Sequence, residues 1–204
     1  MTEVIKAEAP GAPGRAAGVL ESGGVIVYPT ETLYGIGVLV TSAAAVERIF
    51  DIKGRPKAMP IPVLVRDLEM AKSIAEPTPA AERLAERFWP GALTIILKVS
   101  GELDPIITAG TGNVAVRVSS HPFVKALFEC IDIPLTSTSA NPSGAGNILE
   151  SDYIYDAFRD RVELIIDSGN IPASKGSTIV DLTAASPRIV REGDLSSREL
   201  EEYL

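Results

Sequence analysis

The sequence predicts an α/β protein, because short β-branched apolar runs alternate with segments of helical periodicity along its 204 residues. The alternation favours a twisted mixed β-sheet flanked by helices. No internal repeat and no clear linker divides the chain, so we expect one domain spanning residues 1–204. Seven runs have the composition of strands: Val25–Tyr28, Ile61–Val65, Leu93–Val99, Val114–Val118, Ile133–Ser137, Leu164–Asp167 and Thr178–Asp181.

The predicted helices have start signals in the sequence. Residues with side-chain oxygens precede several apolar faces, and proline stands at the first helical position in two of them. A capping box opens a short final helix. The first fourteen residues are rich in Ala, Gly and Pro, and we expect them to be loosely ordered. The start signals are Ser42, Thr78-Pro79, Ser120-His121-Pro122 and Ser196–Glu199.

Composition excludes several classes of protein. The net charge of −8 argues against a general affinity for nucleic acid, although a local basic cleft remains compatible with it. The single cysteine, Cys130, rules out an internal disulfide and is expected in the apolar core; it fits a cytoplasmic setting. No apolar run reaches the roughly 20 residues of a membrane span. No Gly-x-Ser-x-Gly elbow accompanies the only histidine, His121, and no P-loop occurs.

A dense polar segment follows the first predicted strand. Thr30, Glu31, Thr32 and Tyr34 lie where open α/β sheets commonly bind small ligands. These side chains suit turn and strand-end positions equally well. The alternative is a site that hydrogen-bonds a small polar molecule such as an amino acid.

A stiff cationic loop follows the helix that begins near Ser42. Lys53, Gly54 and Arg55 fit a helix C-terminus, where cations and a left-handed glycine are favoured. Two prolines then stiffen the loop, which also carries Lys57, and a stiff cationic loop positions anions at little entropic cost. Together with Arg117, Arg191 and Lys175, these cations suit a polyphosphate if folding brings them together.

A run of hydroxyls, residues 135–144, leaves a strand and enters a turn. It serves either as turn chemistry or as a set of donors that grips phosphate or ribose oxygens. Arg117 lies inside a β-branched strand, on the face that also carries Ala115 and Ser119. That face is either solvated or the ligand face.

Six spaced motifs resemble, in their order, those of YrdC-like proteins, the L-threonylcarbamoyladenylate synthases. The resemblance covers about residues 14–193 and is closest to the short, single-domain form. The motifs are Tyr28–Gly35 (YPTETLYG), Lys53–Pro56 (KGRP), Phe88–Thr94 (FWPGALT), Val114–Val118 (VAVRV), Thr138–Gly144 (TSANPSG) and Ser177–Asp181 (STIVD).

The resemblance implies a YrdC-type fold with a concave basic cleft. It also implies a nucleotidyltransferase reaction in which L-threonine, bicarbonate and ATP give threonylcarbamoyl-AMP and pyrophosphate, for the modification of adenosine 37 in tRNA. Members use Mg²⁺ carried on the nucleotide phosphates, so no protein metal site is expected. A downstream threonylcarbamoyl transferase complex is an implied partner, and direct tRNA binding is left open.

The resemblance also implies roles for individual residues. Lys53 and Arg55 match catalytic, ATP-holding positions, and Arg117 suits the carboxylate of threonine. The positions matched to threonine are Thr32, Arg117, Ser137 and Ser177. Those matched to the nucleotide are Lys53, Arg55, Met59, Asn113, Ser139, Asn141, Asn147 and Arg191.

In the implied chemistry both reactants are anionic, so the cations would offset their repulsion, and no side chain stands out as a general base. Two departures from the family pattern matter: Leu64 stands where many longer relatives carry histidine, and no second domain follows within the 204 residues. Two alternatives remain open at this point. One is a module that binds tRNA or double-stranded RNA, and the other is a paralogue that acts on carbamoyl adenylates.

Overall fold

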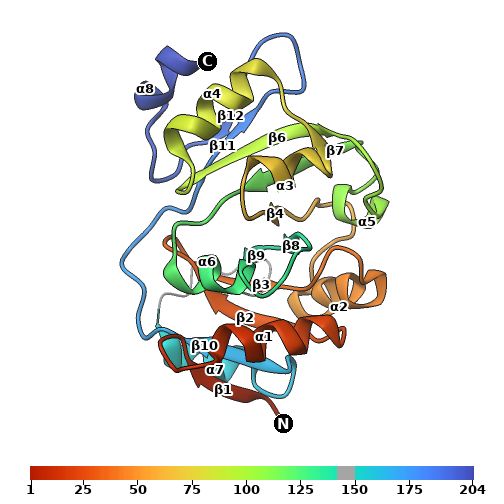
Figure 1. Ribbon diagram of the computed structural model, residues 1–204, viewed down its shortest axis with the longest axis vertical. Coiled ribbons are helices and arrows are strands. Elements are labelled where there is room, and N and C mark those ends of the chain that lie inside the picture. The colour runs from red at the N-terminus through yellow and green to blue at the C-terminus, as the bar shows by residue number, and fades with distance from the viewer. Residues whose placement is uncertain (142–149) are drawn as a thin grey trace.

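The computed structural model describes residues 1–141 and 150–204, and within them the strands form two mixed sheets. The sheets follow one another along the long axis of the molecule, with helices packed around each (Figure 1). The α/β class predicted from the sequence is confirmed. The strands divide between two sheets, however, where the sequence pattern indicated a single one.

The first sheet has five strands and combines three strands from the N-terminal part of the chain with two later ones, β9 and β10. β1, β10 and β2 run parallel, whereas β3 is antiparallel to both of its neighbours. The order is β1 (Glu3–Lys6), β10 (Leu164–Asp167), β2 (Ile26–Pro29), β3 (Tyr34–Gly37) and β9 (Thr138–Ser139).

The second sheet has seven strands and holds the central part of the chain. β6 is its longest strand and is parallel to β11 and antiparallel to β7. Its path is β12 (Arg188–Arg191), β11 (Thr178–Asp181), β6 (Leu93–Val99), β7 (Asn113–Arg117), β4 (Val63–Leu64) and β8 (Leu135–Thr136), with β5 (Ala75–Glu76) beside β6.

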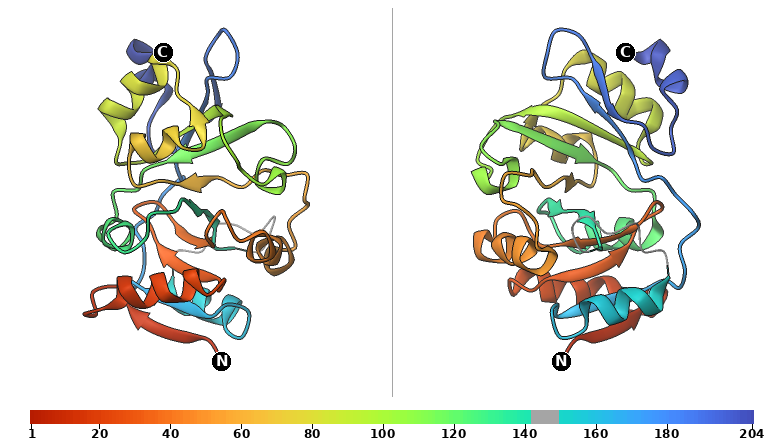
Figure 2. Two further views of the ribbon diagram at one scale, coloured as in Figure 1. Left: turned by 45° about the vertical axis from the view of Figure 1, so that its right-hand side comes forward. Right: turned by 180° about the vertical axis from the view of Figure 1, so that it is seen from behind.

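The chain joins the two sheets in two informative places. Ser137 alone separates β8 of the seven-stranded sheet from β9 of the five-stranded sheet. Between β10 and β11 the chain runs along the outside from one sheet to the other (Figure 2). Residues of both sheets therefore face each other across the middle of the molecule.

The helices cover the outer faces and the ends of the sheets. α2 ends at Gly54, whose φ of 60° is the left-handed conformation that the sequence predicted. Thr78 and His121 cap their helices as predicted, and Ser196 forms the capping box. The helices are α1 (Ala12–Glu21), α2 (Ala43–Lys53), α3 (Leu68–Lys72), α4 (Pro79–Phe88), α5 (Pro105–Thr108), α6 (Pro122–Phe128), α7 (Ser151–Phe158), α8 (Ser197–Leu200) and the 3₁₀ turn η1 (Glu201–Tyr203).

Three local predictions were wrong. The first fourteen residues are ordered, because β1 pairs with β10 along its full length and α1 begins at Ala12. Cys130 is exposed rather than part of the core, since it follows the end of α6. Ser42 is the residue before α2, but its side chain accepts no capping hydrogen bond.

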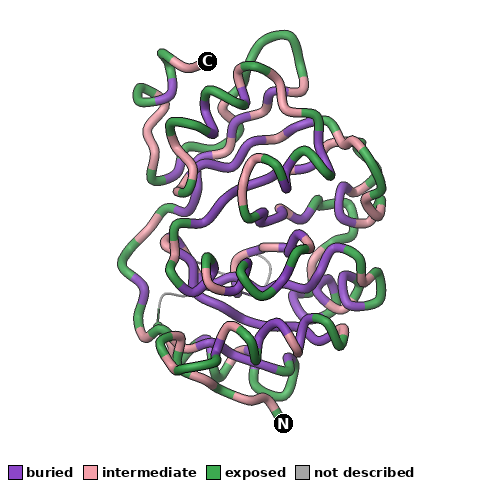
Figure 3. The backbone as a smooth tube through the Cα atoms, viewed as in Figure 1, coloured by how far each residue is buried: buried purple, intermediate pink, exposed green. Residues whose placement is uncertain are grey.

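Burial is concentrated in the strands of both sheets and in the helix faces turned toward them (Figure 3). The strand runs Leu93–Val99, Leu164–Asp167 and Thr178–Asp181 have the bounds that the sequence predicted. Within the described residues, no helix has the length and apolar character needed to cross a membrane.

A close approach between the sheets explains Gly37. A Cβ atom on Gly37 would lie 2.1 Å from the carbonyl oxygen of Thr136 in β8. We expect Gly37→Ala to lower the free energy of unfolding by about 3 kcal/mol, because a backbone atom cannot move aside as a side chain can. Gly18→Ala is the matched control, since Gly18 lies in α1 with no atom within 4 Å of the added Cβ. Urea unfolding measures the free energy of unfolding of both variants. An equal free energy for Gly37→Ala and the wild-type protein would contradict the prediction.

Candidate active site

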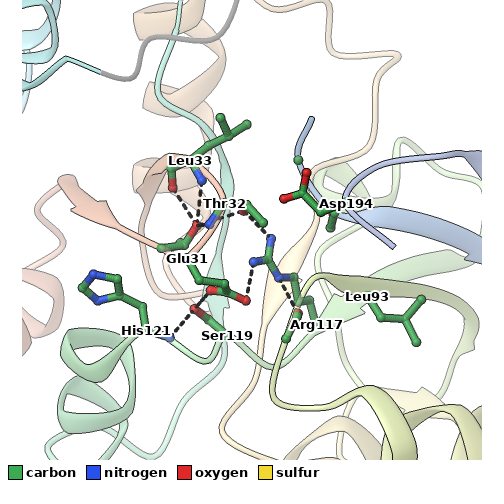
Figure 4. Close-up of polar contacts among 12 residues, drawn as sticks. Glu31, Thr32, Leu33, Leu93, Arg117, Ser119, His121 and Asp194 are labelled. Atoms are coloured by element: carbon green, nitrogen blue, oxygen red, sulfur yellow. Dashed lines mark hydrogen bonds and ion pairs between the residues drawn. The ribbon is translucent and has the colours of Figure 1, made fainter. Parts of the chain in front are cut away.

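A buried arginine links the two sheets at the centre of the molecule. Arg117 ends β7 and is 8% exposed. Its Nη1 donates to Thr32 Oγ1 at 2.9 Å, and its Nη2 lies 2.6 Å from Glu31 Oε1. Its Nε donates to the carbonyl oxygen of Gly91 at 3.1 Å. Figure 4 shows Glu31 and Thr32, from the turn between β2 and β3, converging on this guanidinium.

Glu31 is held on both of its oxygens. Oε1 faces Arg117, and Oε2 accepts a short hydrogen bond from the hydroxyl of Ser119. Burial raises the pKa of the Glu31 carboxyl, but the charge of Arg117 and the hydrogen bond from Ser119 outweigh burial and hold it below its ordinary value. Glu31 is therefore an anion that partly neutralises the guanidinium.

A second arginine, Arg191, belongs to β12 of the same seven-stranded sheet. Arg191 ends β12, and its Nη2 donates to the carbonyl oxygen and the hydroxyl of Ser177 at 2.7 and 3.2 Å. The Ser177 hydroxyl also lies 2.8 Å from that of Thr94. Burial and the charge of Arg117 both lower the pKa of Arg191, so the two guanidiniums are close enough to repel each other.

A buried lysine organises a turn next to β3. Lys53, the last residue of α2, is 4% exposed. Its Nζ donates to the carbonyl oxygen of Ser139, and to the carbonyl oxygen and Oδ1 of Asn141 at 2.7 and 3.4 Å. The hydroxyl of Ser139 donates to Asn141 Oδ1 at 2.6 Å. The motif that begins at Lys53 and the motif that begins at Thr138 thus meet in space, although they are far apart in the sequence.

The cationic loop lies beside this turn. Arg55 donates to the carbonyl oxygens of Met59 and Pro60, with Nη2 2.8 Å from the latter. Burial and the charge of Arg55 lower the pKa of Lys53 to about 8. Burial also lowers the pKa of Arg55 itself. Both cations pay a desolvation cost that a bound anion would offset.

Ser137 directly precedes the turn that Lys53 holds, residues 138–141, which we call the lysine turn. It stands in the single-residue link from β8 to β9, and the hydroxyl of Tyr28 donates to the carbonyl oxygen of the preceding Thr136 at 3.3 Å. A Cβ on Gly35 would lie 3.3 Å from Ser137 Oγ, and Gly35 pairs with Ser139. The absence of a side chain at Gly35 therefore leaves space around the Ser137 hydroxyl.

Several residues singled out from the sequence lie outside the arginine centre, the cluster formed around Arg117 and Arg191. Asn113 and Arg117 stand at opposite ends of β7, about 13 Å apart by strand geometry. The hydroxyl of Tyr34 is engaged by Ser168 N and the carbonyl oxygen of Gly169, outside the arginine centre. Lys175 is exposed. Asn147 and the last three residues of the motif Thr138–Gly144 lie outside the described residues.

Sequence reasoning placed Glu31 in a polar segment that either forms a turn or binds a small polar molecule, and it gave Thr94 and Ser119 no site role. Glu31 stood out only as one of four polar residues in a turn. Its contact with Arg117 joins residues 86 positions apart, and no local sequence pattern predicts this contact. Ser119 was placed on the face of Arg117 by strand alternation, which was the one available signal.

In the part of the chain that the structure describes, no group of three or more His, Cys, Asp or Glu side chains could hold a metal ion. What the fold and site define is an α/β protein with two cationic clusters, one formed by Arg117 of β7 and Arg191 of β12 and the other by Lys53 and Arg55 at the end of α2. The arginine centre suits a carboxylate, and the lysine turn with its loop suits a larger anion.

The chain belongs to the Sua5/YciO/YrdC family. The model of that family, described as "Telomere recombination", matches residues 18–193. The family resemblance found in the sequence is thereby confirmed.

Curated relatives carry the name threonylcarbamoyl-AMP synthase. The Pyrococcus abyssi protein is 37% identical over 93% of this chain and 56% of its own length. The Bacillus subtilis protein is 33% identical with the same two coverages. The chain thus spans about half the length of these two relatives. The Chromobacterium violaceum protein, 35% identical, is covered over 91% of its length.

Solved structures have the same fold. P. abyssi Sua5 complexed with L-threonine matches with a TM-score of 0.93 and 34% identity, over 100% of this chain and 61% of that one. E. coli YciO matches with a TM-score of 0.89 and 29% identity, over 98% of both chains.

Proposed function

We propose that this chain is a threonylcarbamoyl-AMP synthase, a nucleotidyltransferase that converts L-threonine, bicarbonate and ATP to threonylcarbamoyl-AMP and pyrophosphate. The names of the relatives and the threonine complex of P. abyssi Sua5 support the proposal. So do the contacts within each assigned set: Arg117 donates to Thr32 in the threonine set, and Lys53 donates to Ser139 and Asn141 in the nucleotide set.

One observation carries the proposal: the two sets of residues touch. Arg191, assigned to nucleotide phosphate, donates to Ser177, assigned to threonine. Ser137 of the threonine set is two residues from Ser139 of the nucleotide set. A reaction that joins an amino acid derivative to the α-phosphorus of ATP requires this adjacency.

The arginine centre binds and orients threonine. The amine of threonine, once deprotonated, captures CO₂ or bicarbonate as a carbamate. A carbamate oxygen then attacks the α-phosphorus, and the bond to pyrophosphate breaks. Lys53, Arg55 and Arg191 offset the repulsion between the two anions, and positioning supplies much of the rest, up to about 7 kcal/mol.

Mg²⁺ enters this proposal as part of the nucleotide substrate. The described residues offer the ion no cluster of carboxylates, so the triphosphate oxygens are its ligands in our proposal. When bound, the ion neutralises charge on the leaving pyrophosphate. The concave basic cleft, a cytoplasmic location and transfer of the product to a threonylcarbamoyl transferase acting on tRNA belong to the same proposal.

The test is ATP-dependent incorporation of labelled threonine and bicarbonate, followed together with pyrophosphate release. We expect pyrophosphate to appear only when threonine and bicarbonate are both present. Pyrophosphate release that does not depend on threonine would overturn the proposal and favour a paralogue acting on carbamoyl adenylates. Salt-sensitive RNA binding without any ATP binding would favour the RNA-binding alternative.

A further inference from the structure

We propose that Glu31 is the positioning residue of the threonine site: it fixes the Arg117 guanidinium so that the substrate's carboxylate meets two N–H groups in a set geometry. The inference rests on the proposed function. It assigns a role to a residue whose side chain need not touch the substrate.

The first argument is the number of hydrogens on Arg117. Each terminal nitrogen carries two hydrogens. Nη1 donates one hydrogen to Thr32, whereas the buried Nη2 forms an ion pair with Glu31 Oε1 but donates no well-aligned hydrogen bond within the described residues, so both nitrogens have hydrogens left. With Nε anchored to the carbonyl oxygen of Gly91, the guanidinium plane is set from three sides.

The second argument is that Glu31 is itself held in place. Ser119 donates to Oε2 of Glu31 and at the same time accepts from the backbone N–H of His121 at 3.2 Å. His121 caps the first turn of α6 through Nδ1. The carboxylate therefore connects Arg117 to the start of a helix, which is how a second residue rigidifies a binding group.

The third argument is the charge of the centre. Arg117 and Arg191 belong to the same sheet and repel each other, and Glu31 is the anion that pairs with Arg117 among the described residues. One carboxylate against two guanidiniums leaves a single positive charge, which matches the carboxylate of one amino acid. An arriving carboxylate is repelled by Glu31, so the value of Glu31 to the substrate lies in geometry and not in attraction.

These arguments give opposite expectations for two conservative variants. Glu31→Gln keeps the length of the side chain and an oxygen facing Nη2, and it removes the repulsive charge. Glu31→Asp keeps the charge but is one methylene shorter, so it cannot reach Arg117 and Ser119 together. A positioning role predicts that Gln preserves threonine binding and Asp weakens it, whereas a purely electrostatic role, acting through repulsion of the substrate carboxylate, predicts that Gln tightens binding and Asp leaves it unchanged.

The experiment is calorimetric titration of the wild-type protein and both variants with L-threonine, and separately with a nonhydrolysable ATP analogue. We expect the dissociation constant for threonine to stay within about threefold in Glu31→Gln and to rise about tenfold in Glu31→Asp, as for loss of one charge-assisted hydrogen bond. The dissociation constant for the ATP analogue should change in neither. Glu3→Ala, which removes the carboxylate of an exposed Arg–Glu pair with Arg15, is the control and should bind as wild type does.

The outcomes separate the inference from the proposed function. If the wild-type protein does not bind threonine, the proposed function fails, and the inference fails with it. If the wild type binds threonine and Asp binds as tightly as wild type, or Gln binds as weakly as Asp, the positioning role alone is overturned. Equal weakening of threonine and ATP-analogue binding also overturns it, since it would indicate general damage to the fold.

Discussion

Replacing Lys53 by alanine is expected to reduce ATP-dependent threonine incorporation at least 100-fold. The substitution removes a cation from the site, which weakens the stabilisation of phosphate charge by several kcal/mol, about 3 in comparable cases. It also removes the donor that holds the carbonyl oxygens of Ser139 and Asn141. Incorporation of labelled threonine and the dissociation constant of the ATP analogue measure the effect.

The control for Lys53→Ala is Lys57→Ala. Lys57 lies in the loop that follows α2, is exposed, and pairs with Glu47 at 3.0 Å, so it tests whether loss of any cation from this region lowers activity. We expect Lys57→Ala to keep nearly full activity. Full activity in a Lys53→Ala protein that unfolds at the wild-type temperature would show that Lys53 does not contribute to the active site.

Replacing Arg117 by lysine is expected to weaken threonine binding about 100-fold, and replacement by alanine should weaken it at least as much. Lysine keeps the charge, but an ammonium group cannot reproduce the planar contacts to Gly91, Thr32 and Glu31. Alanine also leaves Glu31 buried without its partner, which costs about 3–5 kcal/mol of stability for buried pairs. Calorimetry with threonine, and thermal unfolding, separate the two effects.

Arg15→Ala is the matched control for the Arg117 variants. Arg15 pairs with Glu3 at 2.6 Å, but both side chains are exposed, and such pairs contribute little to stability because water screens them. We expect unchanged threonine affinity in this variant. Threonine binding that survives intact in Arg117→Lys would show that bidentate recognition by the guanidinium is not required.

The elements that were predicted most accurately are those with a clear local sequence pattern. β6, β10 and β11 are continuous β-branched runs, and their bounds were correct. β1 and α1 were missed because nothing in an Ala-, Gly- and Pro-rich segment indicates order. Their stability comes from tertiary contacts: β1 pairs with a strand about 160 residues later, and Ala16 and Leu20 of α1 are buried.

The division into two sheets was beyond local reasoning as well. A period of two residues tells which side chains share a face, but it does not tell which strands are neighbours. In the site, the residues of the lysine turn could be predicted from two spaced motifs. One motif is rich in cations and the other in hydroxyl and amide side chains. Glu31 could not, since its role arises from a contact with a strand that local patterns do not connect to it.

The place of β10 in the five-stranded sheet has a consequence for synthesis of the protein. β10 lies between β1 and β2, although it is translated more than 130 residues after β2. Until it leaves the ribosome, β1 has no partner, and one edge of β2 stays open to other chains. Chaperones that shield open strand edges should therefore associate with nascent chains from which β10 has not yet left the ribosome and release chains in which it has.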